Sequence, residues 1–227
     1  MSAQNQEHPS VKVCSVGVSG TGKSTLFEKL VRRERGVRWV FLYDHKEGDL
    51  SRRFNVPACT TEEALIKKIE RGGFVIFRPE KMFPGNKAKG FEWFCWWLWK
   101  IKNELEGRKI LGADELQALC DESSKPRDLL RILDEGRTFQ FDCFFIAQSM
   151  NGMHNQVRKQ ITEIFAFRQG DENGINFLNR KFPREPKIEW EKLKNGIWHY
   201  KNTITGKVTS GGTAFTPKGA ERDLRGL

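Results

Sequence analysis

One short segment of the chain has the residue types and the spacing that bind a chain of phosphates. Gly17, Gly22, Lys23 and Ser24 complete the Walker A pattern G-x-x-x-x-G-K-[ST]. Glycines let the backbone wrap the phosphates closely, the lysine reaches the β- and γ-phosphates, and the serine hydroxyl binds Mg²⁺. We therefore predict binding of ATP and Mg²⁺, with a catalytic role for Lys23. The predicted contact residues are Gly17, Val18, Ser19, Gly20, Thr21, Gly22, Lys23, Ser24 and Thr25.

Two acids follow an apolar run and supply the second half of such a site. Asp114 is the predicted Walker B acid, expected to hold the hydrated Mg²⁺ together with Ser24 from a neighbouring strand. Glu115 can orient and deprotonate the attacking water, which a hydrolase needs. Asp114 could instead only cap a helix. Asp44, which ends another apolar run, competes as the metal ligand, although His-Lys-Glu follows it and no acid adjoins it.

A polar amide ends the next apolar run, 143–147. Gln148 could sense the γ-phosphate and report its hydrolysis to the rest of the domain, and we count it among the catalytic candidates. Capping of the following turn is an equally good interpretation of this residue.

Strand-length apolar runs alternate with helix-length segments, which is typical of an α/β domain with a largely parallel sheet. We expect strands at 11–18, 38–43, 74–77, 109–113, 142–148 and 163–168, and helices at 26–31, 61–71, 90–106, 127–135, 154–160 and 173–179. A hairpin of 197–200 and 207–209 should follow. The expected organisation is a flexible amino terminus (1–10), a P-loop ATPase domain (11–182) and a basic carboxyl-terminal extension containing the hairpin (183–227).

Composition and charge limit the classes of protein. The 227 residues carry a formal net charge of +10, and residues 180–227 contain eleven Lys or Arg against five acids. This charge favours a polyanionic partner, although a merely basic, soluble surface explains it equally well. The longest apolar run, Trp93–Trp99, is too short to cross a bilayer. The first residues lack the features of a secretory signal, so we expect a protein kept inside a cell. Five cysteines without C-x-x-C spacing and four scattered histidines are typical of reduced thiols and not of a zinc site.

Further motifs resemble the core of the HerA/FtsK superfamily of DNA-pumping ATPases. The resemblance covers roughly residues 11–180 and lies in the order of Glu135-Gly136-Arg137-Thr138, an apolar run, Ala147-Gln148-Ser149, Val157-Arg158, Ile161-Thr162 and Ile164-Phe165-Ala166-Phe167-Arg168. In order and size the chain is similar to the genome-packaging ATPases of tectivirus-type, membrane-containing icosahedral viruses.

That resemblance implies a RecA-like (ASCE) P-loop fold, with a mainly parallel sheet flanked by helices and a small carboxyl-terminal β-hairpin extension. It implies a homo-oligomeric ring, a pentamer or hexamer, that hydrolyses ATP to drive double-stranded DNA through its pore into a preformed capsid. A portal or capsid-vertex protein would be a further partner, and the virion and host cytoplasm the location. The family's arginine finger, which enters the neighbouring subunit's site, maps to Arg137, with Arg168 as a second candidate.

Two other groups of residues could contact DNA. Trp93, Trp96, Trp97 and Trp99 could stack on bases, but aromatic residues at helical spacing are more often core or subunit interface. The loop cations Arg78, Lys81, Lys87 and Lys89 suit sequence-neutral contacts with phosphates better. The basic carboxyl-terminal segment competes with this loop, since it could bind DNA, cover a neighbouring subunit or attach the motor to its docking partner.

Three alternative functions stay open. A morphogenesis ATPase of filamentous phages usually carries a membrane-spanning segment, which is missing here. A nucleotide or small-molecule kinase would need an arginine-rich lid and an acceptor pocket, which the Asp114-Glu115 pair and the glutamine strand disfavour. A nucleotide-switched DNA-binding scaffold would bind ATP and turn over negligibly without a partner.

Overall fold

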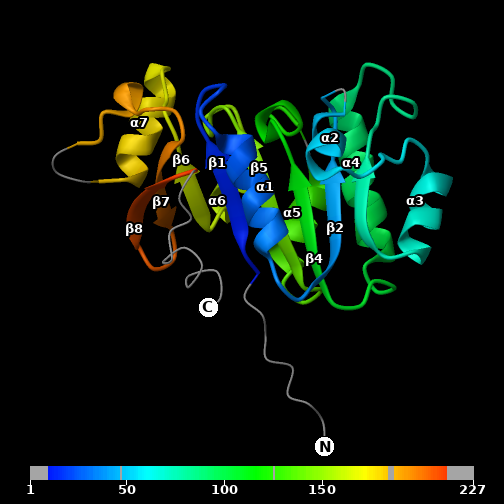
Figure 1. Ribbon diagram of the computed structural model, residues 1–227. Helices are drawn as coiled ribbons and strands as arrows, with labels where there is room; N and C mark the ends of the chain where they lie inside the picture. The colour runs from blue at the N-terminus through cyan, green and yellow to red at the C-terminus, as the bar shows by residue number, and fades with distance from the viewer. Residues whose placement is uncertain (1–9, 47, 125, 184–186, 214–227) are drawn as a thin grey trace, which may run out of the picture.

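A mixed eight-stranded sheet forms the centre of the computed structural model, which describes residues 10–46, 48–124, 126–183 and 187–213 (Figure 1). The strand order is β3-β2-β4-β5-β1-β6-β7-β8. The first six strands in the chain are mutually parallel, and β7 and β8 pair antiparallel. Their bounds are β1 (Lys12–Val16), β2 (Val37–Tyr43), β3 (Gly73–Phe77), β4 (Arg108–Ala113), β5 (Phe141–Ala147), β6 (Glu163–Ala166), β7 (Ile197–Asn202) and β8 (Val208–Gly212).

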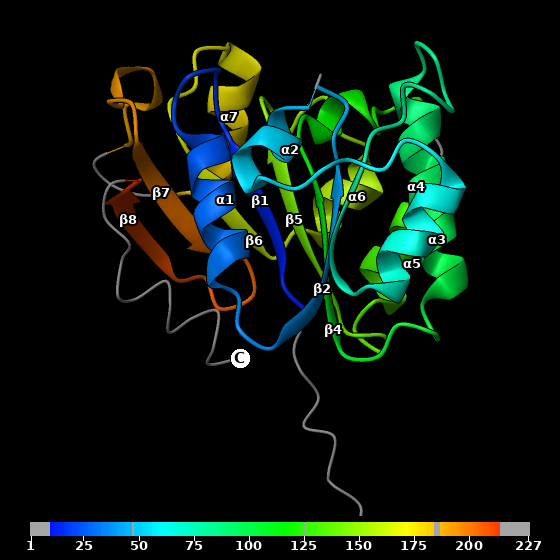
Figure 2. The ribbon, with the colours of Figure 1, turned by 45° about the vertical axis from the view of Figure 1, so that its right-hand side comes forward.

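Helices cover both faces of this sheet (Figure 2). They are α1 (Lys23–Arg33), α2 (Asp49–Phe54), α3 (Glu62–Glu70), α4 (Lys87–Ile101), α5 (Arg127–Glu135), α6 (Asn155–Gln160) and α7 (Glu172–Lys181). Two apolar cores result: one lies between α1, α2 and the sheet, and the larger one lies under α4, α5 and α6. Because both faces are covered, the strand β5, Phe-Asp-Cys-Phe-Phe-Ile-Ala, is buried along its whole length. The predicted α/β fold with a mainly parallel sheet is confirmed.

Helix ends follow their caps, and one helix was not predicted. The Thr61 hydroxyl accepts a hydrogen bond from the Ala64 amide at 3.3 Å and so begins α3 where the sequence predicts it. The prediction of a Trp-rich helix at 90–106 is wrong in its bounds: Asn86 caps the helix and accepts from the Lys89 amide at 3.0 Å, so Lys87 and Lys89 lie in a helical turn and not in a loop. The missed helix, α2, has only six residues, too few to show a period.

The tryptophan-rich face of α4 belongs mostly to the protein interior. Trp97 is buried, and Trp93 and Trp99 are half-buried against the same core. Trp96 differs from them, since its side chain is 39% exposed. The core interpretation therefore holds for three of these four rings, and an interface role for Trp96 stays a prediction. None of the helices in the described part of the chain combines the length and the apolar character needed to span a bilayer.

The carboxyl-terminal hairpin continues the central sheet. β7 pairs antiparallel with β6, and both hairpin strands are longer than the sequence suggested. The Gly196 amide donates to the Thr21 carbonyl at 2.9 Å, and the Thr213 amide donates to the Gly196 carbonyl at 2.7 Å. The base of the hairpin thus touches the predicted phosphate loop. Residues 1–9 and 214–227, which include most of the predicted flexible amino terminus and the basic carboxyl-terminal end, lie outside the described residues.

A buried ion pair closes the amino-terminal edge of the sheet. The fully buried Asp142 carboxylate accepts from Arg108 Nε at 2.6 Å and from the Val11 amide at 2.7 Å, and Arg108 also donates to Glu34 at 2.6 Å. Asp142→Ala is expected to lower the free energy of unfolding by about 2 to 4 kcal/mol, because the Val11 amide and Arg108 Nε lose their buried acceptor while Arg108 keeps its ion pair with Glu34. Urea unfolding measures this loss. Glu106→Ala is the control, since Glu106 pairs with Arg38 at 3.1 Å on the surface and should contribute little. Equal losses in both variants would contradict this account.

Candidate functional site

The phosphate loop, residues 17–24, connects the carboxyl end of β1 to α1. Gly17, Gly20 and Gly22 adopt φ angles of 151°, 75° and 102°, which side chains rarely tolerate. A Cβ on Gly17 would also lie 2.9 Å from the Arg168 carbonyl oxygen, so glycine is required sterically there. Gly22, the N-cap of α1, makes no side-chain capping hydrogen bond, and this positive end of the helix lines the pocket, where it can meet an anion.

Lys23 is held inside the loop that would receive the phosphates. Its Nζ donates to the Val18 carbonyl at 2.7 Å, and the Thr21 hydroxyl donates to the same oxygen at 2.8 Å. Burial lowers the pKa of Lys23 to about 8, while the Asp114 charge opposes this shift. An incoming phosphate would favour the charged form of this lysine.

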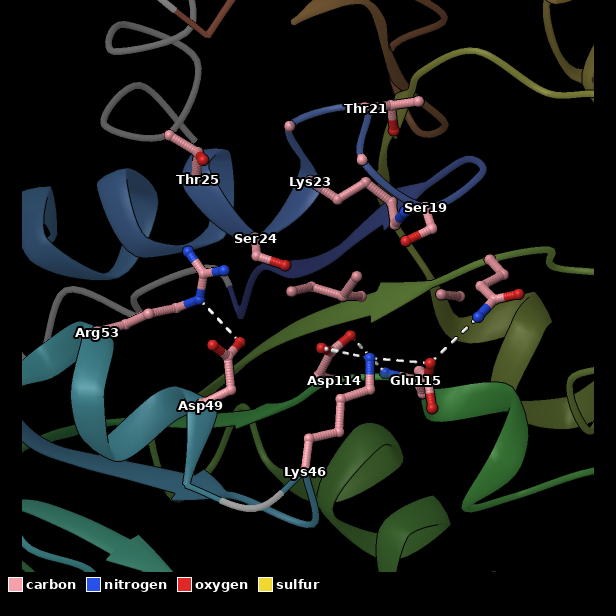
Figure 3. Close-up of a pocket in the computed structure, with 15 residues that line it drawn as sticks. Ser19, Thr21, Lys23, Ser24, Thr25, Lys46, Asp49, Arg53, Asp114 and Glu115 are labelled. Atoms are coloured by element: carbon pink, nitrogen blue, oxygen red, sulfur yellow. Dashed lines mark hydrogen bonds and ion pairs between the residues drawn. The ribbon is translucent and has the colours of Figure 1, made fainter. Parts of the chain in front are cut away.

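The two predicted acids face the phosphate loop across a hollow of about 380 Å³ (Figure 3). Asp114 and Glu115 directly follow β4, and the Glu115 amide donates to Asp114 Oδ1 at 2.7 Å. Glu115 has a left-handed backbone, with φ 48°, which turns the chain sharply after the strand. Because parallel strands end at one edge of the sheet, these acids and the loop after β1 meet there.

The expectation that Asp114 lies on a strand neighbouring β1 is wrong. β5 lies between β1 and β4, so the acids are one strand further away. This order places Gln148, at the end of β5, between the phosphate loop and the acids. Gln148 Nε2 donates to Glu115 Oε1 at 3.1 Å. The structure therefore brings together in one pocket Lys23, Ser24, Asp114, Glu115 and Gln148.

Gln148 is also connected, through its backbone carbonyl, to the start of α7. Gln169 Nε2 donates to the Gln148 carbonyl at 3.1 Å and to Asp171 Oδ2 at 2.8 Å, and Asp171 caps α7 through the Gly174 amide at 2.6 Å. Gln169 is 1% exposed. The buried amide of Gln169 thus links the Gln148 backbone to the start of α7. No sequence pattern indicated this link.

Sequence reasoning missed a lysine at the centre of the pocket. Lys46 Nζ lies 3.0 Å from Asp114 Oδ2 and 2.8 Å from Glu115 Oε1. Burial lowers the pKa of Lys46, but hydrogen bonds and charge interactions with both acids outweigh it and raise the pKa above its ordinary value. Burial raises the pKa of Glu115, yet its bonds to Lys46 and Gln148 bring it below the ordinary value. Burial lowers the pKa of His45, whose Nε2 lies 3.6 Å from Glu115 Oε2.

The competing metal candidate, Asp44, does not line this pocket. It is 1% exposed, and its Oδ2 accepts from the Ser51 amide at 3.2 Å and the Ser51 hydroxyl at 3.1 Å. Asp44 therefore supports the start of α2. That helix brings Asp49 and Arg53, paired at 2.8 Å, to the pocket wall beside Ser24.

The two candidate arginine fingers lie at opposite edges of the sheet. Arg137 is in the turn that leads into β5, at the amino-terminal edge, so it cannot reach the pocket of its own chain. The Arg168 carbonyl accepts from the Val18 amide at 2.9 Å, so its backbone supports the phosphate loop of the same chain. A finger role for either arginine stays a prediction.

A divalent cation fits the pocket chemically. Ser24 supplies a hydroxyl and Asp114 a carboxylate, the oxygen ligands that Mg²⁺ prefers. The Lys46 ammonium between the two acids shows that a positive charge is accommodated there. Among the residues that the structure describes, the pocket included, no group of three or more His, Cys, Asp or Glu side chains could hold a metal ion.

The strand order and the loop after β1 give this chain the fold of the RecA-like P-loop NTPases. Solved structures with this fold include the genome-packaging NTPase B204 from Sulfolobus turreted icosahedral virus 2 in complex with sulfate, with a TM-score of 0.70 at 18% identity over 89% of this chain and 96% of B204. The complex of B204 with AMP has a TM-score of 0.69 at 16% identity, over the same shares of the two chains. VirB4 of Thermoanaerobacter pseudethanolicus has a TM-score of 0.66 at 12% identity, over 95% of this chain and 92% of VirB4.

These identities show a shared fold, and the predicted likeness to packaging ATPases of the HerA/FtsK type is confirmed at that level. No protein-family model matches the chain, and no curated protein matches it.

Proposed function

We propose that this chain is an ATPase that couples ATP hydrolysis to translocation of double-stranded DNA and packages a viral genome into a preformed capsid. The observation that carries the hydrolysis part of the proposal is the Glu115–Gln148 pair, joined by a hydrogen bond of 3.1 Å and placed across one pocket from the phosphate loop. The fold shared with the viral packaging NTPase supports it. Hydrolysis needs a carboxylate beside the γ-phosphate to activate water, and Glu115 faces the phosphate loop from across the pocket.

Each residue in the pocket has a chemical task in this reaction. Lys23 and the amides that begin α1 neutralise and orient the β- and γ-phosphates. Ser24 and Asp114 would hold Mg²⁺, which neutralises the charge that develops on the phosphates. Glu115 accepts the proton of the attacking water, and Gln148 orients Glu115 and senses the γ-phosphate. The contact from Gln148 through Gln169 to α7 is a route by which hydrolysis could move the rest of the domain.

The site needs a second copy of the chain in this proposal. The pocket wall contains Arg53, which is paired with Asp49, and Arg137 lies at the opposite edge of the sheet. A ring of five or six copies would supply Arg137 to a neighbour's γ-phosphate, where such fingers contribute about 10³ to 10⁵ in rate. The net charge of +10 suits a pore for duplex DNA. A portal or capsid-vertex protein would anchor the ring, at the packaging vertex of the virion or in the host cytoplasm.

Mixing two inactive variants tests the shared site. The Lys23→Ala protein lacks a working phosphate loop but can still supply Arg137 to a neighbour. The Arg137→Ala protein keeps its phosphate loop but supplies no arginine finger. Each alone should hydrolyse ATP at a rate lower by about 10³-fold or more, and a mixture should recover part of the native rate. The recovered hydrolysis should be stimulated by DNA, and its rate should rise more than linearly with protein concentration.

The control for this mixture is Arg137→Ala combined with the double variant Lys23→Ala, Arg137→Ala, which supplies no finger and should not recover. The ring would be contradicted if Arg137→Ala alone hydrolysed ATP at the native rate, with a rate proportional to protein concentration and unaffected by DNA. The remaining candidate functions would then be a kinase and a nucleotide switch.

A further inference from the structure

The Lys46 side chain occupies the place between the two acids of the site. Lys46 follows β2, and β2 is paired with β4, so the sheet brings the lysine beside Asp114 and Glu115 at the same edge. Figure 3 shows its amine reaching both carboxylates from the side opposite the phosphate loop. The amine lies 3.0 Å and 2.8 Å from them, within the range of direct ionic hydrogen bonds.

The charges that face this point balance. Lys23 and Lys46 bring two positive charges, and Asp114 and Glu115 bring two negative ones. The Asp49–Arg53 pair on the wall is neutral as a whole, and His45 approaches Glu115 from β2 with a pKa that burial lowers. Two carboxylates this close would otherwise repel each other or attract a free metal ion, because the site is partly shielded from water. Asp114 is only 9% exposed and Glu115 21% exposed.

We infer that Lys46 is the internal cation of the nucleotide-free site and competes with a divalent cation for the Asp114 carboxylate. Lys46 would release Asp114 when a divalent cation binds there, and its amine would keep the bond to Glu115 and position that carboxylate. Lys46 is thus a positioning residue that makes metal binding depend on nucleotide. This inference rests on the proposed function of the pocket.

Manganese binding to the nucleotide-free protein tests the inference. Mn²⁺ is titrated into the native chain, Lys46→Met, Lys46→Gln and Lys46→Arg, and free Mn²⁺ is followed by electron paramagnetic resonance. Removing the amine should tighten Mn²⁺ binding by about tenfold or more, because the two acids lose their cation. Lys46→Arg should resemble the native chain. Adding Asp114→Asn to Lys46→Met should abolish the gain.

Two results would overturn the inference: equal Mn²⁺ affinity in native, Met and Gln forms that melt like the native protein, or a gain that survives Asp114→Asn. Having both neutral variants keeps the test decisive if one of them fails to fold. The titration uses neither ATP nor DNA, so its outcome is separate from that of the proposed function. If the native chain shows DNA-stimulated hydrolysis and the Lys46 variants bind Mn²⁺ with the native affinity, the proposed function stands and only the role of Lys46 is rejected.

Discussion

Glu115→Gln is expected to lower the rate of ATP hydrolysis by about 10² to 10⁴-fold and to leave ATP affinity unchanged. The amide keeps the shape of the side chain and can still meet Gln148 and Lys46, whose atoms lie 3.1 Å and 2.8 Å from Glu115 Oε1. What it loses is the ability to accept a proton from water. The pKa of Glu115 lies below its ordinary value, so the carboxylate is ionised at neutral pH and ready for that task.

The measurement for Glu115 separates binding from chemistry. Equilibrium titration with a fluorescent ATP analogue gives the affinity, and phosphate release in a single turnover gives the rate of the chemical step. Glu106→Gln is the matched control, because Glu106 is an exposed acid far from the pocket with a side chain 83% exposed. A Glu115→Gln protein that hydrolyses ATP at the native rate would exclude Glu115 as the base.

Lys23→Ala should show the other large effect, a fall in kcat/KM of about 10³-fold with loss of tight nucleotide binding. Removing one donor aimed at a developing oxyanion costs about 10² to 10³-fold, and Lys23 also carries a full charge to the phosphates. The variant should stay folded. Burial disfavours the charged amine and lowers its pKa to about 8, so the native chain gains little stability from it.

Calorimetric titration with ATP and thermal melting check both parts of that result. Lys67→Ala, a substitution of an exposed lysine on α3, is the control and should bind ATP like the native chain. Native ATP affinity in Lys23→Ala would mean that residues 17–24 do not hold the phosphates.

The sequence predicted the strands and the chemistry at their ends well, because both are local properties. Apolar runs of strand length fix β1 and β5, and the residues that follow them, the phosphate loop and Gln148, are adjacent in the chain. Strand order is not local, however. β5 lies between β1 and β4, and only the folded sheet shows that Gln148 therefore reaches Glu115.

Lys46 shows the limit of prediction from sequence most clearly. It follows Asp44 and His45 in a turn with no distinctive pattern. Its partner Asp114 lies 68 positions further along the chain, and Glu115 is the next residue. The pairing of β2 with β4 creates the contact. The signal that could have found it is the lysine that follows a strand end, which we interpreted only as evidence against Asp44.

The most direct test of the central claim is displacement of a third strand from duplex DNA. A fluorescent triplex-forming oligonucleotide is placed at increasing distances from a duplex end, and its release is followed after ATP and Mg²⁺ are added. We expect release that requires hydrolysis, is delayed further as the distance grows, and disappears in Glu115→Gln. ATP hydrolysis at the native rate with no release at any distance, under conditions where the chain binds DNA, would contradict it.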